Sequence, residues 1–487
     1  MKEKSNVIFS SFIWRFLERF GAKGVEFIVS IILARLLAPE VYGTIALVTV
    51  FTTILNVFVD SGFGNALIQK KDADDVDFSS VFYFNFLVCL LLYGLIFFIA
   101  PFIANFYEMT ELTPIVRVLS LTIVISGIKN IQQAYVTRNL LFKKFFFSTL
   151  GGTIVAAVIG IWMAYRGYGV WALVAQQLIN ATIDTIILWI TVKWRPKLVF
   201  SLYRLKGLLS YGWKLLVSAL LDTLYTDIRQ LVIGKFYSSS DLAFYNQGKK
   251  YPNLLASNIN TSIDSVLLPV MSSEQDNKER VKAMTRRSIK TSIYLMAPIM
   301  CGMCATATVL VSLLLTDKWL PCVPYLRVFC ITFIFYPVHT ANLNAIKALG
   351  RSDLFLKLEL IKKIEGAIVL LATIWFGPFV MACSGLVTVW IGQMINAWPN
   401  KKLLGYPYKE QLFDILPTLI LSTVMCVSVW VLGLLPLRNW LILLIQVVAG
   451  VAIYVGGSML LKIDSFYYCI NIVKGFLHKG NGLDWLQ

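Results

Sequence analysis

Charged side chains are scarce in this sequence. Only 15% of its 487 residues are Asp, Glu, Lys or Arg, whereas soluble domains average about 25%. Hydrophobic residues make up 57%, and the mean hydropathy is +0.71. The apolar runs recur from end to end, with no polar domain between them. These properties exclude a string of soluble domains and predict an all-α integral membrane protein that crosses the bilayer many times.

Residue types that carry chemistry are also few. His339 and His478 are the only histidines, and no His/Glu zinc motif, phosphate-binding loop or nucleophile elbow occurs. Cys301 and Cys304 form a CxxC inside an apolar run, without the second pair of ligands that a zinc site needs. We therefore expect no metal, no cofactor and no enzymatic activity. We expect His339 to be a hydrogen-bonded packing residue.

Acidic residues are outnumbered, with 27 Asp and Glu against 44 Lys and Arg and a net charge of +17. In a soluble protein this excess would suggest nucleic-acid binding. Cytoplasmic loops of membrane proteins collect Lys and Arg in any case, so we expect no nucleic-acid partner. The N-terminus has charges within its apolar part and no small-residue cleavage site, which predicts a retained first helix rather than a removable signal peptide.

Long apolar runs dominate the chain. A helix needs roughly 20 apolar residues to cross a hydrocarbon core of about 30 Å. Runs and turn signals together predict about fourteen membrane helices on this basis. Their expected limits are 10–38, 41–68, 79–106, 113–137, 147–166, 169–193, 207–235, 241–270, 286–315, 320–349, 352–377, 380–400, 411–435 and 438–461.

The distribution of Lys and Arg predicts the orientation. If the N-terminus is cytoplasmic, far more Lys and Arg fall in the inside loops and tails than in the outside loops. The positive-inside rule then predicts that both termini are cytoplasmic and that the number of spans is even. The basic residues left for the outside loops are Arg35, Arg117, Arg166, Lys235, Lys318 and Arg438.

The two halves of the chain share short motifs. Gly152-Thr-Ile-Val reappears as Gly366-Ala-Ile-Val. Four further residues recur with their mutual spacing kept, namely Gly169, Gln177, Ile179 and Asn180 at Gly385, Gln393, Ile395 and Asn396. Chance similarity between apolar segments is the alternative explanation. Parallel repeats of this kind are a transporter design in which the substrate is held between the halves.

Repeats and helix counting together predict two six-helix bundles and two trailing helices. The expected divisions are 1–206 for the first bundle, 207–404 for the second and 405–461 for helices 13 and 14. Residues 462–487 are basic and aromatic, which predicts a cytoplasmic tail with a short interfacial helix.

Several charged residues fall inside the predicted spans, where a centred charge costs about 2.5–3.5 kcal/mol on insertion scales. In the first span, Arg15, Glu18, Arg19 and Glu26 fall within a narrow wedge at helical spacing, with Lys23 at its edge. An amphipathic helix on the membrane surface is the alternative. The apolar stretch that follows favours a span whose polar face lines a wet cavity.

The seventh and eighth spans carry polar faces as well. In the seventh, Asp222, Tyr225 and Arg229 share a face, and the alternative is an Asp222–Arg229 pair that only joins helices. In the eighth, a stripe of about five turns predicts cavity lining rather than a solvated surface helix. Its members are Asn246, Lys249, Lys250, Asn253, Ser257, Asn260 and Asp264.

Shorter polar patterns occur in two more spans. The sixth contains Gln177, Asn180 and Asp184 at helical spacing, and the second contains Asn56 and Asp60. Hydrogen bonding between helices and cavity lining explain these patterns equally well.

Cations, amides and aromatic residues therefore dominate the expected cavity. Lys and Arg bind phosphate, amides bind hydroxyl groups, and aromatic rings stack on sugar faces. This combination suits a ligand that carries both phosphate and sugar. An exporter of cationic drugs would need a mainly acidic cavity.

Three segments carry a resemblance to a known family. They are Leu33-Ala-Arg-Leu-Leu-Ala-Pro-Glu-Val-Tyr-Gly43, Asp60-Ser-Gly-Phe-Gly-Asn-Ala-Leu-Ile68 and Phe236-Tyr-Ser-Ser-Ser-Asp-Leu-Ala-Phe-Tyr-Asn246. The sequence resembles the polysaccharide-lipid flippases of the multidrug/oligosaccharidyl-lipid/polysaccharide (MOP) exporter superfamily. It looks closest to the Wzx-type branch of colanic acid and teichuronic acid exporters.

The resemblance implies two six-helix bundles arranged in a V, as in MATE transporters and the lipid II flippase MurJ. It implies that an undecaprenyl-diphosphate-linked oligosaccharide is flipped across the bacterial cytoplasmic (inner) membrane by alternating access, with glycan polymerase machinery as a further partner. Implied diphosphate contacts are Arg15, Arg19, Lys23, Lys249 and Lys250. Arg229, Tyr225, Asn253 and Asn260 complete the expected substrate-binding set.

Coupling to a proton or sodium gradient is also implied by the resemblance. The acidic residues that could serve it are Glu18, Glu26, Asp60 and Asp222, and their spacing does not choose among them.

Three alternative functions stay open. A drug or metabolite antiporter on the same fold would differ by an acidic cavity lining, and a lipid II flippase would share the basic one. A membrane glycan polymerase or ligase is disfavoured by short outside loops, which leave little room for a catalytic site.

Overall fold

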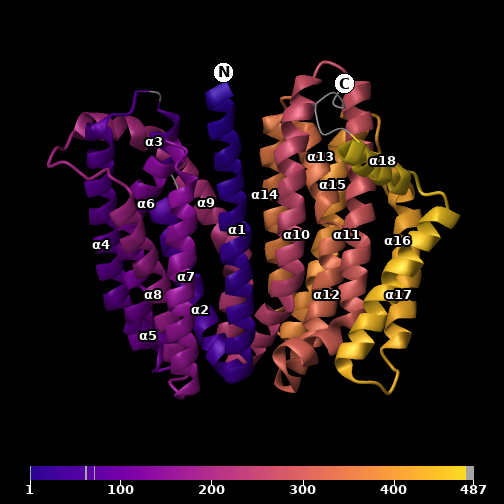
Figure 1. The fold of residues 1–487 in the computed structure, drawn as a ribbon, viewed down its shortest axis with the longest axis horizontal. Helices are drawn as coiled ribbons and strands as arrows, with labels where there is room; N and C mark the ends of the chain where they lie inside the picture. The colour runs from indigo at the N-terminus through magenta and orange to yellow at the C-terminus, as the bar shows by residue number, and fades with distance from the viewer. Residues whose placement is uncertain (1, 61–62, 71, 479–487) are drawn as a thin grey trace. The chain divides into compact units, whose positions relative to one another are not determined.

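The computed structural model describes residues 2–60, 63–70 and 72–478. Within these residues, helices and their connections make up the whole structure (Figure 1). The predicted all-α membrane fold is confirmed. The described chain forms two compact units, Met1–Ala243 and Phe244–Gln487, which we call unit 1 and unit 2.

The helices of unit 1 follow the predicted spans closely. Their bounds are α1 Lys2–Leu36, α2 Pro39–Asp60, α3 Phe63–Gln69, α4 Asp75–Phe106, α5 Leu112–Leu119, α6 Leu121–Arg138, α7 Phe142–Tyr165, α8 Val170–Thr191 and α9 Leu202–Phe236. The expected span 113–137 is divided at Ser120 into α5 and α6.

The helices of unit 2 follow the predictions in the same way. After α10 (Ser239–Ser273), which contains the division between the units, come α11 Lys278–Leu315, η1 Asp317–Cys322, α12 Val323–Ile334, α13 Tyr336–Ala348, α14 Ser352–Thr373, α15 Pro378–Leu403, α16 Tyr408–Leu432, α17 Asn439–Leu460 and α18 Asp464–His478. The expected span 320–349 consists of η1, α12 and α13. Pro337, near the start of α13, has no N–H to continue the helix of α12, which explains the break.

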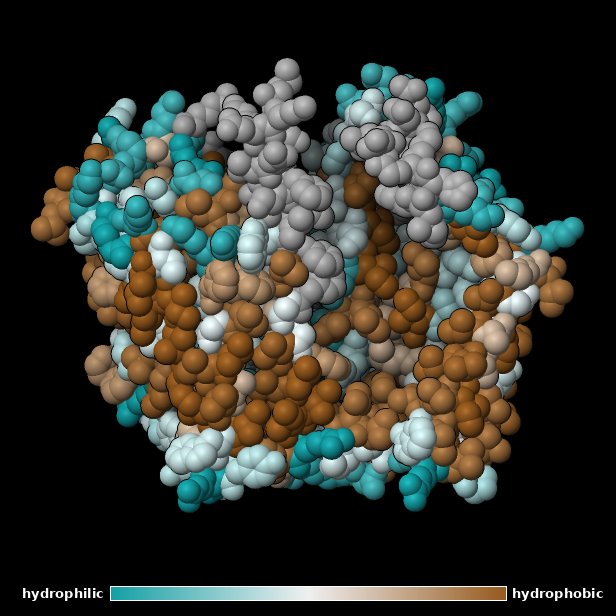
Figure 2. Space-filling model, in the orientation of Figure 1, coloured by the Kyte–Doolittle hydropathy of each residue, from teal (hydrophilic) through white to brown (hydrophobic). Residues whose placement is uncertain are grey.

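Among the described residues, ten helices or runs of consecutive helices are long and apolar enough to cross a membrane. They are α2, α4, α5–α6, α7, α8, α11, η1–α13, α15, α16 and α17. Figure 2 shows hydrophobic surface on the flanks of each unit and hydrophilic residues at its ends. The chain is therefore a multi-pass membrane protein.

Four further helices correspond to predicted spans but are not among these ten. They are α1, α9, α10 and α14. They have 35, 35, 35 and 22 residues, so length does not set them apart. Their polar residues set them apart, and three of them are the spans whose polar faces the sequence singles out. A total of fourteen spans stays a prediction.

Helix packing in unit 1 centres on α7. This helix packs against both α1 and α8. A side chain at Gly152 of α7 would begin 2.9 Å from Asn180 Oδ1 and 3.0 Å from the Asn180 carbonyl oxygen, so glycine permits the close approach of α8. In unit 2, α11 packs against α12, α13, α16 and α17 and occupies the centre of the bundle.

Helix α9, which helix counting assigns to the second bundle, packs against α2, α3 and α4 in unit 1. The domain limits 206, 404 and 461 stay predictions. Residues 464–478 form α18, so the expected helix in the tail is present, and its position at the membrane interface stays a prediction.

Candidate functional site

The polar face of α1 is described only in part. The side chains of Arg15, Glu18 and Arg19 lie outside the described residues. Lys23 and Glu26 form an ion pair of 3.1 Å, with side chains that are 73% and 59% exposed. Such an exposed pair contributes little to stability, and it leaves both groups accessible to a ligand.

The predicted face of α9 is largely exposed. Asp222 and Tyr225 are both exposed, and Arg229 is half-buried. Thr226 donates a hydrogen bond to the carbonyl oxygen of Asp222, one turn earlier in the same helix. This face of α9 is therefore not sealed inside unit 1. The side chain of Asp60, another predicted coupling residue, lies outside the described residues.

The predicted stripe on α10 has two parts with different surroundings. Lys249 and Lys250 are half-buried, and Asn253 and Ser257 are exposed. These four residues place cationic and polar groups together on an accessible part of the helix.

Farther along α10, two residues of the stripe form hydrogen bonds with the neighbouring helix α13. Asn260 accepts a hydrogen bond of 2.7 Å from Thr340, and Asp264 accepts one of 2.8 Å from Asn344. Both partners are four residues apart on their helices, so two successive turns are joined. This part of the stripe therefore has the role of joining helices, which the sequence pattern did not distinguish from cavity lining.

A largely buried ion pair lies in unit 1. Lys129 Nζ on α6 is 3.0 Å from Asp184 Oδ2 on α8, and the two side chains are 19% and 14% exposed. Ser148 on α7 donates to both the carbonyl oxygen and the carboxylate of Asp184. Removing two charges from water is costly, so the pair must be held in good geometry by all three helices. The sequence pattern marked Asp184 but did not pair it with Lys129.

Unit 2 has a neutral polar cluster at the repeat-equivalent position. Asn180 and Asn396 are equivalent in the repeat, and Asp184 and Asn400 each follow four residues later, so they are equivalent as well. Asn400 donates to Asn342 Oδ1 at 2.7 Å, and Asn342 exchanges hydrogen bonds with Gln411. Both units therefore have a polar group at this position inside their helix packing, which supports the repeat.

His339 is a packing residue, as predicted. Its Nδ1 lies 2.9 Å from Asn396 Nδ2, and its ring packs against Gly392, where a Cβ would be 3.1 Å away.

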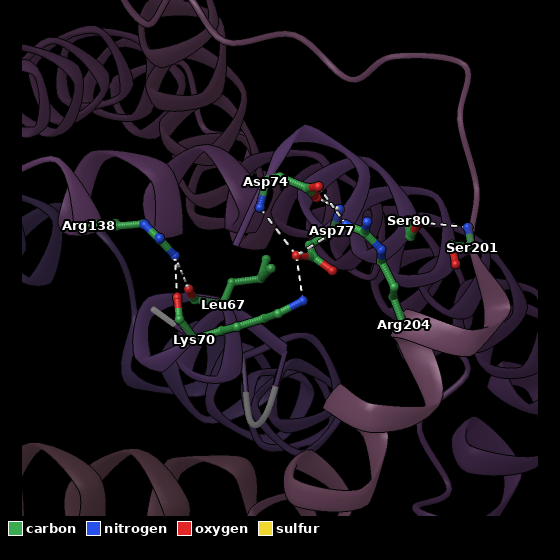
Figure 3. Close-up of polar contacts among 8 residues, drawn as sticks. All are labelled: Leu67, Lys70, Asp74, Asp77, Ser80, Arg138, Ser201 and Arg204. Carbon is green, nitrogen blue, oxygen red and sulfur yellow. Dashed lines mark hydrogen bonds and ion pairs between the residues drawn. The ribbon is translucent and has the colours of Figure 1, made fainter. Parts of the chain in front are cut away.

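A second cluster joins α3, α4, α6 and the start of α9 at one end of unit 1 (Figure 3). Arg138 donates to the carbonyl oxygens of Leu67 and Lys70 at 2.8 and 2.7 Å. Lys70 Nζ lies 2.6 Å from the carboxylate of Asp77, which is fully buried. The two basic side chains thus hold the segment that follows α3 against α4 and α6.

The same cluster anchors α9. Arg204 donates to Asp74 Oδ2 at 2.6 Å, and the backbone N–H of Ser201 donates to the Ser80 hydroxyl at 2.9 Å. Asp74 and Asp77 also form a capping box at the start of α4. Hydrogen bonds from Arg204 and the Asp77 N–H hold the pKa of Asp74 at about 2. From the sequence alone, Lys70, Arg138 and Arg204 are basic residues of the expected inside loops, and no helical spacing connects them with Asp74 or Asp77.

Comparison with known sequences shows the family. The polysaccharide biosynthesis protein family matches residues 32–324, more than half of the chain. The teichuronic acid biosynthesis protein TuaB of Bacillus subtilis (strain 168) is 26% identical over 310 residues, 62% of this chain and 63% of TuaB. The match thus spans less than two thirds of TuaB.

Two further relatives come from other bacteria. The succinoglycan biosynthesis transport protein ExoT of Rhizobium meliloti (strain 1021) is 25% identical over 333 residues, 66% of this chain and 67% of ExoT. The lipopolysaccharide biosynthesis protein WzxC of Escherichia coli (strain K12) is 21% identical over 425 residues, 82% of this chain and 83% of WzxC.

Comparison with solved structures shows the fold. The inward closed conformation of the lipid II flippase MurJ superposes with a TM-score of 0.77 at 17% identity, covering 93% of this chain and 99% of MurJ. An inward-facing MATE family transporter of the MOP superfamily superposes with a TM-score of 0.61 at 13% identity, covering 80% and 98%. The chain belongs to the polysaccharide biosynthesis protein family and has the fold of the MOP exporters.

Proposed function

We propose that this protein is a flippase for a lipid-linked oligosaccharide, moving undecaprenyl-diphosphate-linked repeat units across the cytoplasmic membrane by alternating access for polysaccharide export. One observation carries the proposal. On a MOP fold whose relatives are named for polysaccharide biosynthesis, the long helices α1, α9 and α10 are too polar to count among the ten apolar spans. Polar residues within a membrane bundle mark a substrate path.

The chemistry of α10 fits such a substrate. The adjacent cations Lys249 and Lys250 suit a diphosphate, and the exposed Asn253 and Ser257 suit sugar hydroxyl groups. Lys23 on α1 is an accessible cation that pairs with the exposed Glu26. Arg15 and Arg19 belong to the same proposed set, with Arg229, Tyr225 and Asn260 as further candidates.

Transport of this kind changes the location of the substrate and not its bonds, so the proposal includes no catalytic residue and no cofactor. It places both termini in the cytoplasm and names glycan polymerase machinery as the partner that receives the product. For coupling to a proton or sodium gradient, the proposed carboxylates are Glu18, Glu26, Asp60 and Asp222.

The test compares the leaflets in cells that lack this protein. Undecaprenyl-diphosphate-linked glycan is expected to accumulate in the inner leaflet, and the wild-type gene is expected to restore its delivery to the outer leaflet. A Lys249→Ala/Lys250→Ala variant that reaches the membrane should restore at least tenfold less, because two phosphate contacts are lost. The matched control is Lys401→Ala/Lys402→Ala, an adjacent exposed pair at the end of α15.

Two outcomes would overturn the proposal. Normal outer-leaflet delivery without the protein, with redundant flippases removed, would favour an ion-coupled antiporter of drugs or metabolites. Accumulation of lipid II instead of the oligosaccharide would favour a lipid II flippase. Equal rescue by the α10 variant and its control would remove Lys249 and Lys250 from the mechanism.

A further inference from the structure

A basic cavity lies in unit 2 where α18 packs against α11. Its volume is about 330 Å³, and its charged lining residues are Arg286, Arg287, Lys290 and Asp464, with Thr291, Ser465 and Tyr468 beside them. Arg286, Arg287 and Lys290 belong to α11, and Ser465 and Tyr468 belong to α18. Figure 1 shows α18 running at a large angle to α11 near one end of that helix. Three cations are thus presented within little more than one helical turn.

Two of the three cations are neutralised inside unit 2. Arg286 binds Glu410 at 3.1 Å and Asp414 at 2.6 Å. Lys290 binds Asp464 at 3.0 Å, but the Asp464 side chain is 83% exposed. An exposed pair of this kind is weak, so Lys290 can exchange its carboxylate for another anion.

Arg287 is held differently. Its guanidinium lies 4.8 Å from the centre of the Tyr468 ring, and no ion pair of Arg287 occurs in the part of the chain that the structure describes. Stacking on an aromatic ring orients a guanidinium while leaving its N–H donors available. Arg287 therefore offers an oriented charge in the lining of a cavity that Thr291 and Ser465 also line.

Exposed apolar residues precede α18 in the chain. Met459, Leu460 and Leu461 come just before Asp464 in the chain, at the end of α17, and are 51%, 85% and 60% exposed. A cationic cavity with exposed apolar side chains a few residues away along the chain matches an amphiphile with an anionic head and acyl chains. A soluble phosphate would use the cations and leave the aliphatic surface uncovered.

We propose that this cavity binds the headgroup of an anionic phospholipid, with its phosphate at Arg287 and Lys290 and its acyl chains along Leu460 and Leu461. The inference needs only the membrane location and does not rest on the proposed substrate. A bound lipid would join α11, α17 and α18 from one side of unit 2.

The experiment measures lipid binding to the purified full-length protein by native mass spectrometry. Phosphatidylglycerol and phosphatidylcholine with the same acyl chains are compared. The wild type should prefer phosphatidylglycerol, and Arg287→Ala/Lys290→Ala should weaken its binding about tenfold, because two charge-assisted contacts are lost. The matched control, Lys278→Ala/Arg280→Ala, removes the same charge from exposed positions of α11 outside the cavity lining and should keep the preference.

Three results would overturn the proposal. One is equal binding of both lipids by the wild type, and another is equal weakening by the double variant and its control. The third is competition by glycerol phosphate at the concentration at which phosphatidylglycerol binds, which would identify a site for soluble phosphate. If the double variant does not fold, Arg287→Gln, which keeps a polar side chain over Tyr468, is measured in its place with the same expected direction.

Discussion

The backbones of Gly43 and Ser239 are in direct contact in unit 1. A Cβ atom added to Gly43 of α2 would lie 1.7 Å from the carbonyl oxygen of Ser239, at the start of α10. Next to this contact, the Ser240 hydroxyl donates to Glu40 Oε1 at 2.7 Å. Gly43 ends one of the three segments that carry the family resemblance, and Ser239 lies inside another. Two of the three segments that carry the family resemblance therefore meet at this close approach.

The first prediction concerns this contact. Gly43→Ala should force the two segments apart and destabilise the protein by about 1–3 kcal/mol, because a backbone oxygen cannot rotate away as a side chain can. The measurement is the apparent melting temperature of the purified protein. Gly94→Ala is the control, since nothing lies within 4 Å of a Cβ at Gly94. Equal melting of both variants would contradict the prediction.

The second prediction concerns the Lys129–Asp184 pair. Lys129→Met should destabilise unit 1 by about 3–5 kcal/mol, because it leaves the largely buried Asp184 carboxylate without its partner. Lys129→Met/Asp184→Asn should recover much of this loss, because an amide at 184 reproduces the neutral Asn400 of unit 2. Thermal unfolding of the two variants checks this. A double variant no more stable than the single one would show that the charge of Asp184 is not the cause.

The third prediction concerns pH. The folded-state pKa of Asp74 is lowered from 3.8 to about 2, so its contribution to stability is present above pH 4 and is lost as the pH falls from 4 towards 2. Asp74→Asn should therefore lower the melting temperature at pH 6 and have a smaller effect at pH 3. Because the Asp74 side chain is about half exposed, solvent screens the ion pair and the difference is expected to be small. A difference that stays constant between pH 6 and pH 3 would exclude the Asp74–Arg204 ion pair as its source.

The fourth prediction concerns the neutral cluster of unit 2. Asn342→Leu removes the side-chain hydrogen bonds to Gln411 and Asn400 and leaves the buried Gln411 Oε1 without its donor, whereas both amide nitrogens keep a bond to a backbone carbonyl oxygen. The expected loss is about 1–3 kcal/mol. Asn258→Leu is the control, because the Asn258 side chain is exposed and donates to the Leu254 carbonyl oxygen one turn earlier in the same helix. A comparable loss of thermal stability in both would contradict this role of Asn342.

Two parts of the candidate site differ in how well they were predicted. The sequence pattern found the polar face of α10, because residues at helical spacing share a face whatever their surroundings. It treated Asn253 and Asn260 alike, although Asn253 is exposed and Asn260 binds Thr340. The difference depends on where α13 lies, and periodicity along one helix carries no information about its neighbour.

The sequence by itself determined the membrane location, the order of the helices and nearly all of their limits, because hydropathy and turn residues act over short stretches of chain. It also identified the helices with polar faces. Only the tertiary structure decided which charges meet. Lys129 and Asp184 are 55 residues apart in the chain, and Arg204 and Asp74 are 130 apart. Their pairing depends on the packing of separate helices, which is set by the fit of many side chains and by glycines such as Gly152.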